Sequence, residues 1–93
     1  MIKSFRHKGL EQFYVSGIKS DIRPHHAAKL SVQLTTMQAA ETPNDLRMPT
    51  AWRLHQLSGD MKGFWPITVN GNWRVIFKFD KTDIELVDYL DCH

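Results

Sequence analysis

The stretch that most constrains the fold is residues 64–79, FWPITVNGNWRVIFKF, where two apolar runs flank a turn signal. A two-residue turn at residues 70–71 would set Arg74 beside Ile67 across a hairpin. A three-residue loop over 70–72 pairs apolar residues with apolar residues instead. Because a one-residue slip moves a strand's whole apolar set to the other face, we predict the second register. Its pairs are Val69 with Trp73, Ile67 with Val75, and Trp65 with Phe77.

The same register predicts what lies on the opposite face of the hairpin. Arg74 falls there, opposite Thr68, away from the apolar face. Pro66 cannot donate a ladder bond, so its nitrogen must point away from any partner strand. A guanidinium on a sheet face suits phosphate, because its planar donors match phosphate oxygens in pairs. Pairing of Arg74 with an acid on the next strand, such as Glu85, is the equally open alternative.

The remaining pattern predicts two helices before a run of strands, which favours an α+β fold with helices on one face of a mainly antiparallel sheet. One helix covers residues 8–16 and stops at Gly17. The second covers 24–41, with an apolar stripe at three- and four-residue spacing, and stops before Pro43. The stripe is Ala27, Leu30, Leu34 and Met37. Strands are predicted at 2–6, 53–57, 64–69, 73–79 and 84–89, with a helical turn at 44–47.

Composition narrows the class without fixing it. The 93 residues predict one domain over 1–93, and a net charge of +2 permits an RNA partner without requiring one. The single cysteine excludes an internal disulfide. No apolar run could cross a bilayer and no signal peptide is seen at the start, so a cytoplasmic location is expected.

Judged singly, the polar side chains give little evidence for a catalytic or ligand-binding role. His7, His25 and His26 are expected on the solvated surface, and His55 on a strand. His93 is the last residue, where fraying is usual. No spacing suits a metal and no phosphate loop is present, so neither metal nor cofactor is predicted. Lys62, Lys78, Asp88 and Asp91 are expected to be solvated charges.

Three blocks of sequence carry a family resemblance. They are the opening MIKSFRHKGLEQFY, the block RLHQLSGDMKGFWPITVNGNWRVIF, and the ending DYLDCH. Together they resemble HigB-type toxins of the RelE superfamily, also called plasmid maintenance killer proteins. The similarity extends over nearly the whole chain.

The resemblance implies a compact RelE-like fold and ribosome-dependent cleavage of messenger RNA in the decoding site, without a metal. It also implies a HigA-type helix-turn-helix antitoxin that neutralises the toxin and represses their operon, in a hetero-oligomer that binds operator DNA. By position, Arg74 matches the family's phosphate-stabilising arginine and His93 the terminal histidine, a candidate acid or base. His55 and Asp91 match supporting positions.

The chain departs from the family pattern at three places. Ser58 and Asn70 stand where many members carry a lysine and a second arginine, and Cys92 stands where the tail usually has tyrosine. Ser58 and Asn70, together with Lys62 and Lys78, are the residues expected to bind RNA. A slower enzyme, or a catalytically weakened module that binds ribosome or antitoxin without cutting, is the alternative. A ribonuclease acting without the ribosome is less favoured, because the site offers few catalytic groups.

Overall fold

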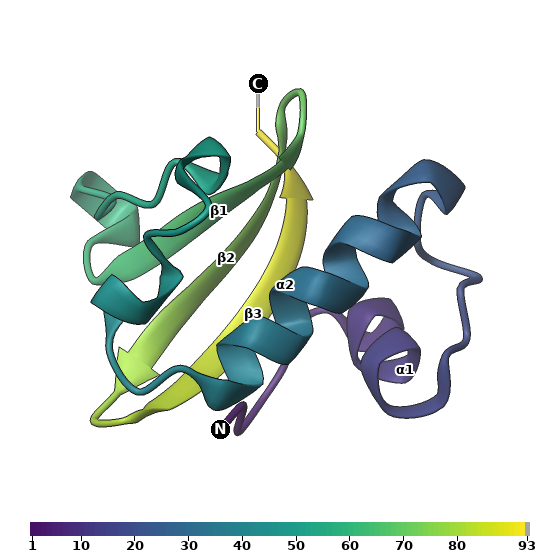
Figure 1. Ribbon diagram of the computed structural model, residues 1–93, viewed down its shortest axis with the longest axis horizontal. Helices are drawn as coiled ribbons and strands as arrows, with labels where there is room; N and C mark the ends of the chain where they lie inside the picture. The colour runs from purple at the N-terminus through teal and green to yellow at the C-terminus, as the bar shows by residue number, and fades with distance from the viewer. Residues whose placement is uncertain (93) are drawn as a thin grey trace.

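Three antiparallel strands form the sheet of this chain, whose computed structural model describes residues 1–92. They are β1 (Phe64–Asn70), β2 (Trp73–Asp80) and β3 (Asp83–Asp91), in the order β1-β2-β3. Helix α2 (Ala27–Ala39) lies across one face of the sheet with α1 (Lys8–Ser16) beside it (Figure 1). The predicted α+β class is confirmed. Within residues 1–92, no helix has the length and apolar character needed to span a membrane.

The central hairpin follows the predicted register except at its turn. Trp65 lies opposite Phe77, Ile67 opposite Val75, and Thr68 opposite Arg74, all as predicted. The loop has two residues, 71–72, and Asn70 rather than Val69 lies opposite Trp73. A bulge between Thr68 and Asn70 absorbs the extra residue, so the apolar set keeps its face despite the shorter turn.

The two helices follow their sequence signals closely. The side chain of His7 accepts a hydrogen bond from the backbone N–H of Leu10 at the start of α1, and Gly17, in the left-handed region with φ 76°, ends it. The second predicted helix divides into a 3-10 turn, Pro24–His26, and α2. The predicted stripe is confirmed, since Leu30, Leu34 and Met37 are fully buried and Ala27 is partly so. The turn predicted at 44–47 is a 3-10 turn, Pro43–Leu46.

The opening strand predicted at 2–6 is reduced to two isolated parallel bridges with β3, Ile2 to Ile84 and Phe5 to Val87. A bulge in β3 explains the interruption. The register against β2 shifts between Ile76 and Lys78, and Leu86 adopts a left-handed φ of 57°. The Ser4 hydroxyl accepts the backbone N–H of Leu86 at 2.9 Å, so the bulge is held by the N-terminal segment.

The prediction of a strand at 53–57 is wrong. That segment is extended beside β1 but makes a single ladder-type bond, from the Leu57 N–H to the Phe64 carbonyl at 3.0 Å. Two features of the β1 edge prevent a ladder. Pro66 has no N–H to donate on this side, and the Thr68 carbonyl already accepts the Gln33 side chain at 2.7 Å.

Candidate functional site

Arg74 lies half-buried on the sheet face away from α2, near the Gly71–Asn72 turn. Its Nη1 donates to the carbonyl oxygens of Gly71, at 2.7 Å, and of Trp73, at 3.0 Å. A guanidinium has five N–H donors, so these two contacts fix its orientation and leave others for a ligand. The turn itself therefore preorganises the arginine.

The alternative pairing of Arg74 with an acid is wrong for the residues that the structure describes. Glu85 lies opposite Lys78, and its carboxylate pairs with Lys3 at 3.9 Å. Within residues 1–92, no carboxylate forms an ion pair with Arg74. Its positive charge is thus available to an anionic ligand.

The end of the chain lies next to the same turn. Asp91 ends β3 opposite Trp73, and the Cys92 N–H donates to the Asn72 carbonyl at 2.8 Å. Because side chains alternate along a strand, this register assigns Asp91 the face of Trp73 rather than that of Arg74. His93, the predicted acid or base, lies outside the described residues.

His55 lies exposed in the extended segment beside β1. Its Nδ1 is 2.8 Å from the carbonyl oxygen of Arg53. A carbonyl only accepts, so Nδ1 carries the proton, and the lone pair of the neutral ring lies on Nε2. Since Leu57 bonds Phe64 and the segment runs antiparallel to β1, His55 lies at about the level of Pro66. The imidazole is therefore oriented with its basic nitrogen free of this contact.

The predicted RNA-binding residues divide between the two ends of β1. Asn70 is exposed at the turn end, near Arg74, whereas Ser58 and Lys62 are exposed before the start of β1. Lys78 lies four residues from Arg74 on β2, which at strand spacing is about 13 Å. A polynucleotide chain can span this separation.

The face that carries Arg74 is less open than predicted. Phe64 and Ile76 are 9% and 4% exposed, and Pro66 is also buried. The ammonium of Lys78 and the guanidinium of Arg6 each lie 5.6 Å from the centre of the Phe64 ring. The two cations cover these buried apolar side chains, so this part of the face presents positive charge rather than apolar surface.

His26 was expected on the surface but is 1% exposed. Its Nδ1 lies 2.6 Å from the Tyr89 hydroxyl, and its ring meets those of Tyr89 and Trp73 edge-on. Arg23 stacks its guanidinium 4.9 Å above Trp73. Two histidines at a helix start carry no signal for this burial, which arises because β2 and β3 place aromatic rings beneath the 3-10 turn.

Burial, followed by the positive charges of His25, Arg23 and Lys29, lowers the pKa of His26 from its ordinary value. Burial likewise raises the pKa of the Tyr89 phenol, against a smaller opposing effect of the Arg23 backbone N–H. Both groups are therefore neutral at pH 7, and Nδ1 and the phenol share a hydrogen bond. This cluster stabilises the ends of β2 and β3 beneath the site.

No group of three His, Cys, Asp or Glu side chains capable of holding a metal occurs within residues 1–92. The candidate groups are an arginine held by two backbone carbonyls, a histidine whose ring is oriented by a third carbonyl, and the predicted lysines. Such groups supply positive charge and proton transfer to a phosphate ester.

Residues 3–93 match the model of a family described as the RelE-like toxin, HigB, of type II toxin–antitoxin systems. The chain belongs to this HigB-like toxin family. It is similar to Endoribonuclease HigB of Proteus vulgaris, with 36% identity over 93 residues and all of both chains covered. It is also similar to Toxin HigB-1 of Vibrio cholerae, with 35% identity over 94 residues, covering 100% of this chain and 98% of the relative.

Solved structures agree with this assignment at the level of the fold. YafQ from E. coli superposes with a TM-score of 0.64 at 18% identity, covering 96% of this chain and 89% of that one. A YoeB-YefM complex from Staphylococcus aureus contains a chain with a TM-score of 0.62 at 14% identity, with 97% and 95% covered. The predicted RelE-like fold is confirmed. As a toxin of a type II system, the chain has an antitoxin partner.

Proposed function

We propose that this chain is a toxin that cuts messenger RNA bound to the ribosome. The observation that carries the proposal is Arg74, whose guanidinium is oriented by two backbone carbonyls and has no carboxylate partner within residues 1–92. The name of the Proteus vulgaris relative, an endoribonuclease, supports RNA cleavage. Dependence on the ribosome rests on the family resemblance alone.

The proposed reaction uses the RNA's own 2′-hydroxyl as nucleophile. A base takes the hydroxyl proton, the oxygen bonds to the adjacent phosphorus, and the P–O5′ bond breaks. An acid protonates the leaving 5′-oxygen, which leaves a 2′,3′-cyclic phosphate and a 5′-hydroxyl end. The negative charge that accumulates on the phosphate oxygens is the feature that a fixed guanidinium stabilises.

The residues divide these tasks as follows. Arg74 binds the non-bridging phosphate oxygens. His55 presents its Nε2 outward, because its Nδ1–H donates to the Arg53 carbonyl, and this orientation suits a general base. His93, which the family resemblance makes a candidate acid or base, would then act as the acid, with Asp91 in support. Lys62 and Lys78 bind the flanking backbone.

We further propose a HigA-type antitoxin with a helix-turn-helix domain as the partner. The complex would bind operator DNA through that domain. Co-expression of the toxin with the reading frame next to its gene, followed by affinity purification, tests this. Recovery of the toxin without the neighbouring product contradicts it.

Expression in a bacterium, with and without Arg74→Ala, tests the cleavage proposal. The unaltered chain should arrest growth and create new 3′ ends in translated messages. Removal of one preorganised charge donor typically costs about 10²- to 10³-fold in rate, so Arg74→Ala should abolish arrest at matched protein levels. Lys19→Ala, an exposed cation in the loop after α1, is the matched control.

The outcomes separate the proposal from its alternatives. Arrest without new message ends indicates the binding module that the uncharged Ser58 and Asn70 suggest. Cleavage of naked RNA by purified protein indicates a ribonuclease that needs no ribosome. Equal arrest by the unaltered chain and Arg74→Ala shows that the site is wrongly assigned.

A further inference from the structure

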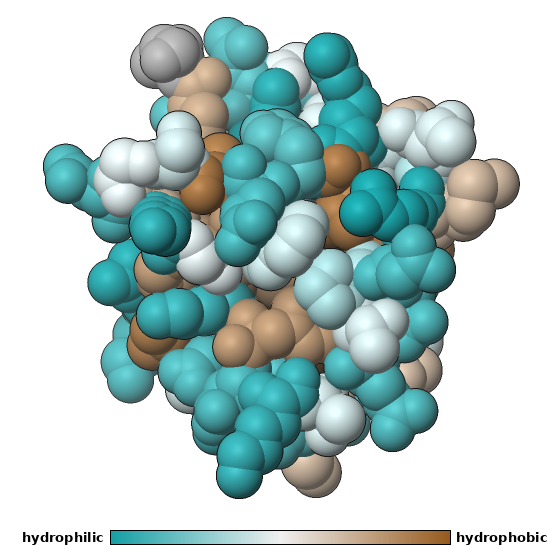
Figure 2. Space-filling view, turned by 90° about the vertical axis from the view of Figure 1, so that its left-hand side faces the viewer, coloured by the Kyte–Doolittle hydropathy of each residue, from teal (hydrophilic) through white to brown (hydrophobic). Residues whose placement is uncertain are grey.

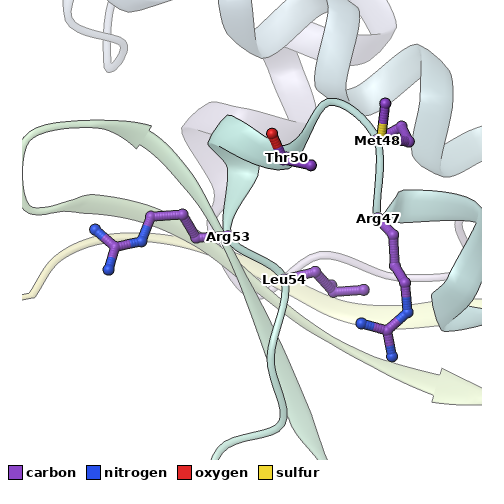
Figure 3. A pocket seen from close by; sticks show the side chains of 5 residues that line it. All are labelled: Arg47, Met48, Thr50, Arg53 and Leu54. Carbon is purple, nitrogen blue, oxygen red and sulfur yellow. The ribbon is translucent and has the colours of Figure 1, made fainter.

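A hollow on the β1 side of the molecule lies outside the residues assigned so far. It has a volume of about 300 Å³ and lies where the chain passes from the 3-10 turn Pro43–Leu46, through the turn Thr50–Trp52, to the extended segment beside β1. Two arginines, a hydroxyl and two apolar side chains line it (Figure 3). They are Arg47, Met48, Thr50, Arg53 and Leu54.

Both arginines at this hollow carry charge that no acid neutralises within residues 1–92. The Nε of Arg47 donates to the side-chain oxygen of Asn44 at 2.9 Å, a neutral partner. Both side chains are exposed. Figure 3 shows the two guanidinium groups pointing apart, on either side of Leu54. They therefore suit a ligand with spaced negative charges rather than one small anion.

The backbone at Arg53 is unusual. This residue has φ 55° and ψ 47°, the left-handed region, at the end of the turn Thr50–Trp52. A residue with a Cβ pays about 1 kcal/mol or more there, and such strain concentrates at functional sites. The same residue's carbonyl accepts the His55 ring nitrogen at 2.8 Å. The hollow is thus joined through one residue to the candidate base.

The lining of the hollow matches one nucleotide. Met48 is 71% exposed and Leu54 is half-buried, and together they offer an apolar surface to a base. The guanidinium groups suit phosphates on either side, and the Thr50 hydroxyl is close by in the same lining. Pockets for small ligands begin at roughly 300 Å³, so the hollow has room for a single nucleotide unit.

The surrounding surface favours RNA over a protein segment. Figure 2 looks at this side of the molecule, where hydrophilic residues dominate and hydrophobic ones emerge in separate small areas. A partner helix docking by its apolar face would need a continuous hydrophobic groove. Single-stranded nucleic acid instead binds along positively charged surface, with separate contacts for its bases.

We propose that this hollow is an accessory subsite that binds one nucleotide of single-stranded RNA outside the scissile bond. Arg47 and Arg53 bind the flanking phosphates, and Met48 and Leu54 contact the base. The inference rests on the proposed function, because RNA must be the substrate for the subsite to matter.

Binding of a 2′-O-methyl oligoribonucleotide, which cannot be cut, tests the subsite by fluorescence anisotropy over a range of salt concentrations. Arg47→Gln and Arg53→Gln should each weaken binding about tenfold. Each should also reduce the slope of log affinity against log salt by about 0.7, the value for one lost phosphate contact on a single strand. Arg53→Lys keeps the charge and should keep the slope.

Two further variants separate charge from apolar contact. Met48→Ala should weaken binding about threefold with no change in the salt slope, because it removes apolar contact alone. Lys19→Gln, which removes an exposed charge in the loop after α1, should match the unaltered protein. Thermal melting confirms that each variant remains folded.

The subsite proposal is contradicted if Arg47→Gln and Arg53→Gln bind the oligonucleotide as tightly as Lys19→Gln does. It is also contradicted if the unaltered chain does not bind the oligonucleotide. A poly-glutamate peptide that binds with the same dependence on Arg47 and Arg53 overturns the assignment to RNA. Failure of the proposed function gives a different result. New message ends would then be absent in cells, while Arg47→Gln and Arg53→Gln would still weaken binding of the oligonucleotide.

Discussion

Replacing His26 with phenylalanine tests the linkage between the buried aromatic cluster and pH. Burial first, and then the charges of His25, Arg23 and Lys29, lowers the pKa of this ring. The unfolded ring therefore takes up a proton at a higher pH than the folded ring. The stability contribution is fully present above the unfolded pKa of about 6.5 and is lost as pH falls below it, down to the folded pKa.

The magnitudes follow from the contacts. Within that window, each pH unit removes at most about 1.4 kcal/mol from the free energy of unfolding. His26→Phe leaves the Tyr89 hydroxyl, 2.6 Å from Nδ1, without its acceptor. An unsatisfied buried hydroxyl costs about 1–3 kcal/mol, and this cost is the same at every pH in the range. The variant is therefore less stable at pH 7.5, and the difference narrows towards pH 5.5.

Urea unfolding at pH 7.5, 6.5 and 5.5 measures both quantities, with unchanged m-values as the check on two-state behaviour. His55→Gln removes one exposed histidine and should keep the pH dependence of the unaltered chain. A difference between the unaltered chain and His26→Phe that stays constant over the whole range would refute the linkage.

Two further substitutions probe packing, each measured by urea unfolding. Gly9→Ala gains about 1 kcal/mol of helix propensity, but its new Cβ would lie 2.3 Å from the Asp21 Cβ; overpacking should leave a net loss of about 1–2 kcal/mol. Asp21→Gly should relieve this loss, and a Gly9→Ala protein as stable as the original contradicts the clash. Gln33→Glu places a carboxylate at a fully buried position beside the Thr68 carbonyl. It should cost roughly 3 kcal/mol at pH 7.5 and less at pH 5, and equal stability at pH 7.5 contradicts this.

The hairpin could be read from sequence because its constraint is local. Apolar residues alternate on both runs, so only one register buries them together, and the pairs Trp65 with Phe77 and Ile67 with Val75 are observed. The bulge near Asn70 could not be read, because a two-residue turn with a bulge and a three-residue loop bury the same side chains.

The predictions that failed concern residues whose structure depends on contacts far away in the sequence. The segment 53–57 alternates like a strand, yet its neighbour β1 offers Pro66 and an already bonded Thr68 carbonyl. His26 stands beside a second histidine at a helix start, yet Tyr89, 63 residues later, provides its hydrogen bond. Periodicity reports a segment's own faces and says nothing of which partner reaches them.

The candidate site was likewise predictable only in part. Arg74 was placed on its face by register, and the structure adds the two carbonyls that orient it. The hollow at Arg47 and Arg53 gave no signal in the sequence, because its residues come from irregular turns. The geometry of the turns brings these residues together, and no periodic sequence pattern predicts that.

The distribution of charge gives these separate features one physical consequence. The acids of β2 and β3 near their shared turn are neutralised locally, since Asp80 and Glu85 pair with Lys3, and Asp83 pairs with the terminal amine at 3.6 Å. Arg74 and the two arginines of the hollow have no such partners within residues 1–92. A net charge of only +2 therefore does not describe how paired and unpaired charges are distributed over the surface. Because exposed charges act over about 8–10 Å at physiological salt, arginines without acidic partners would attract a polyanion more strongly than the paired end does.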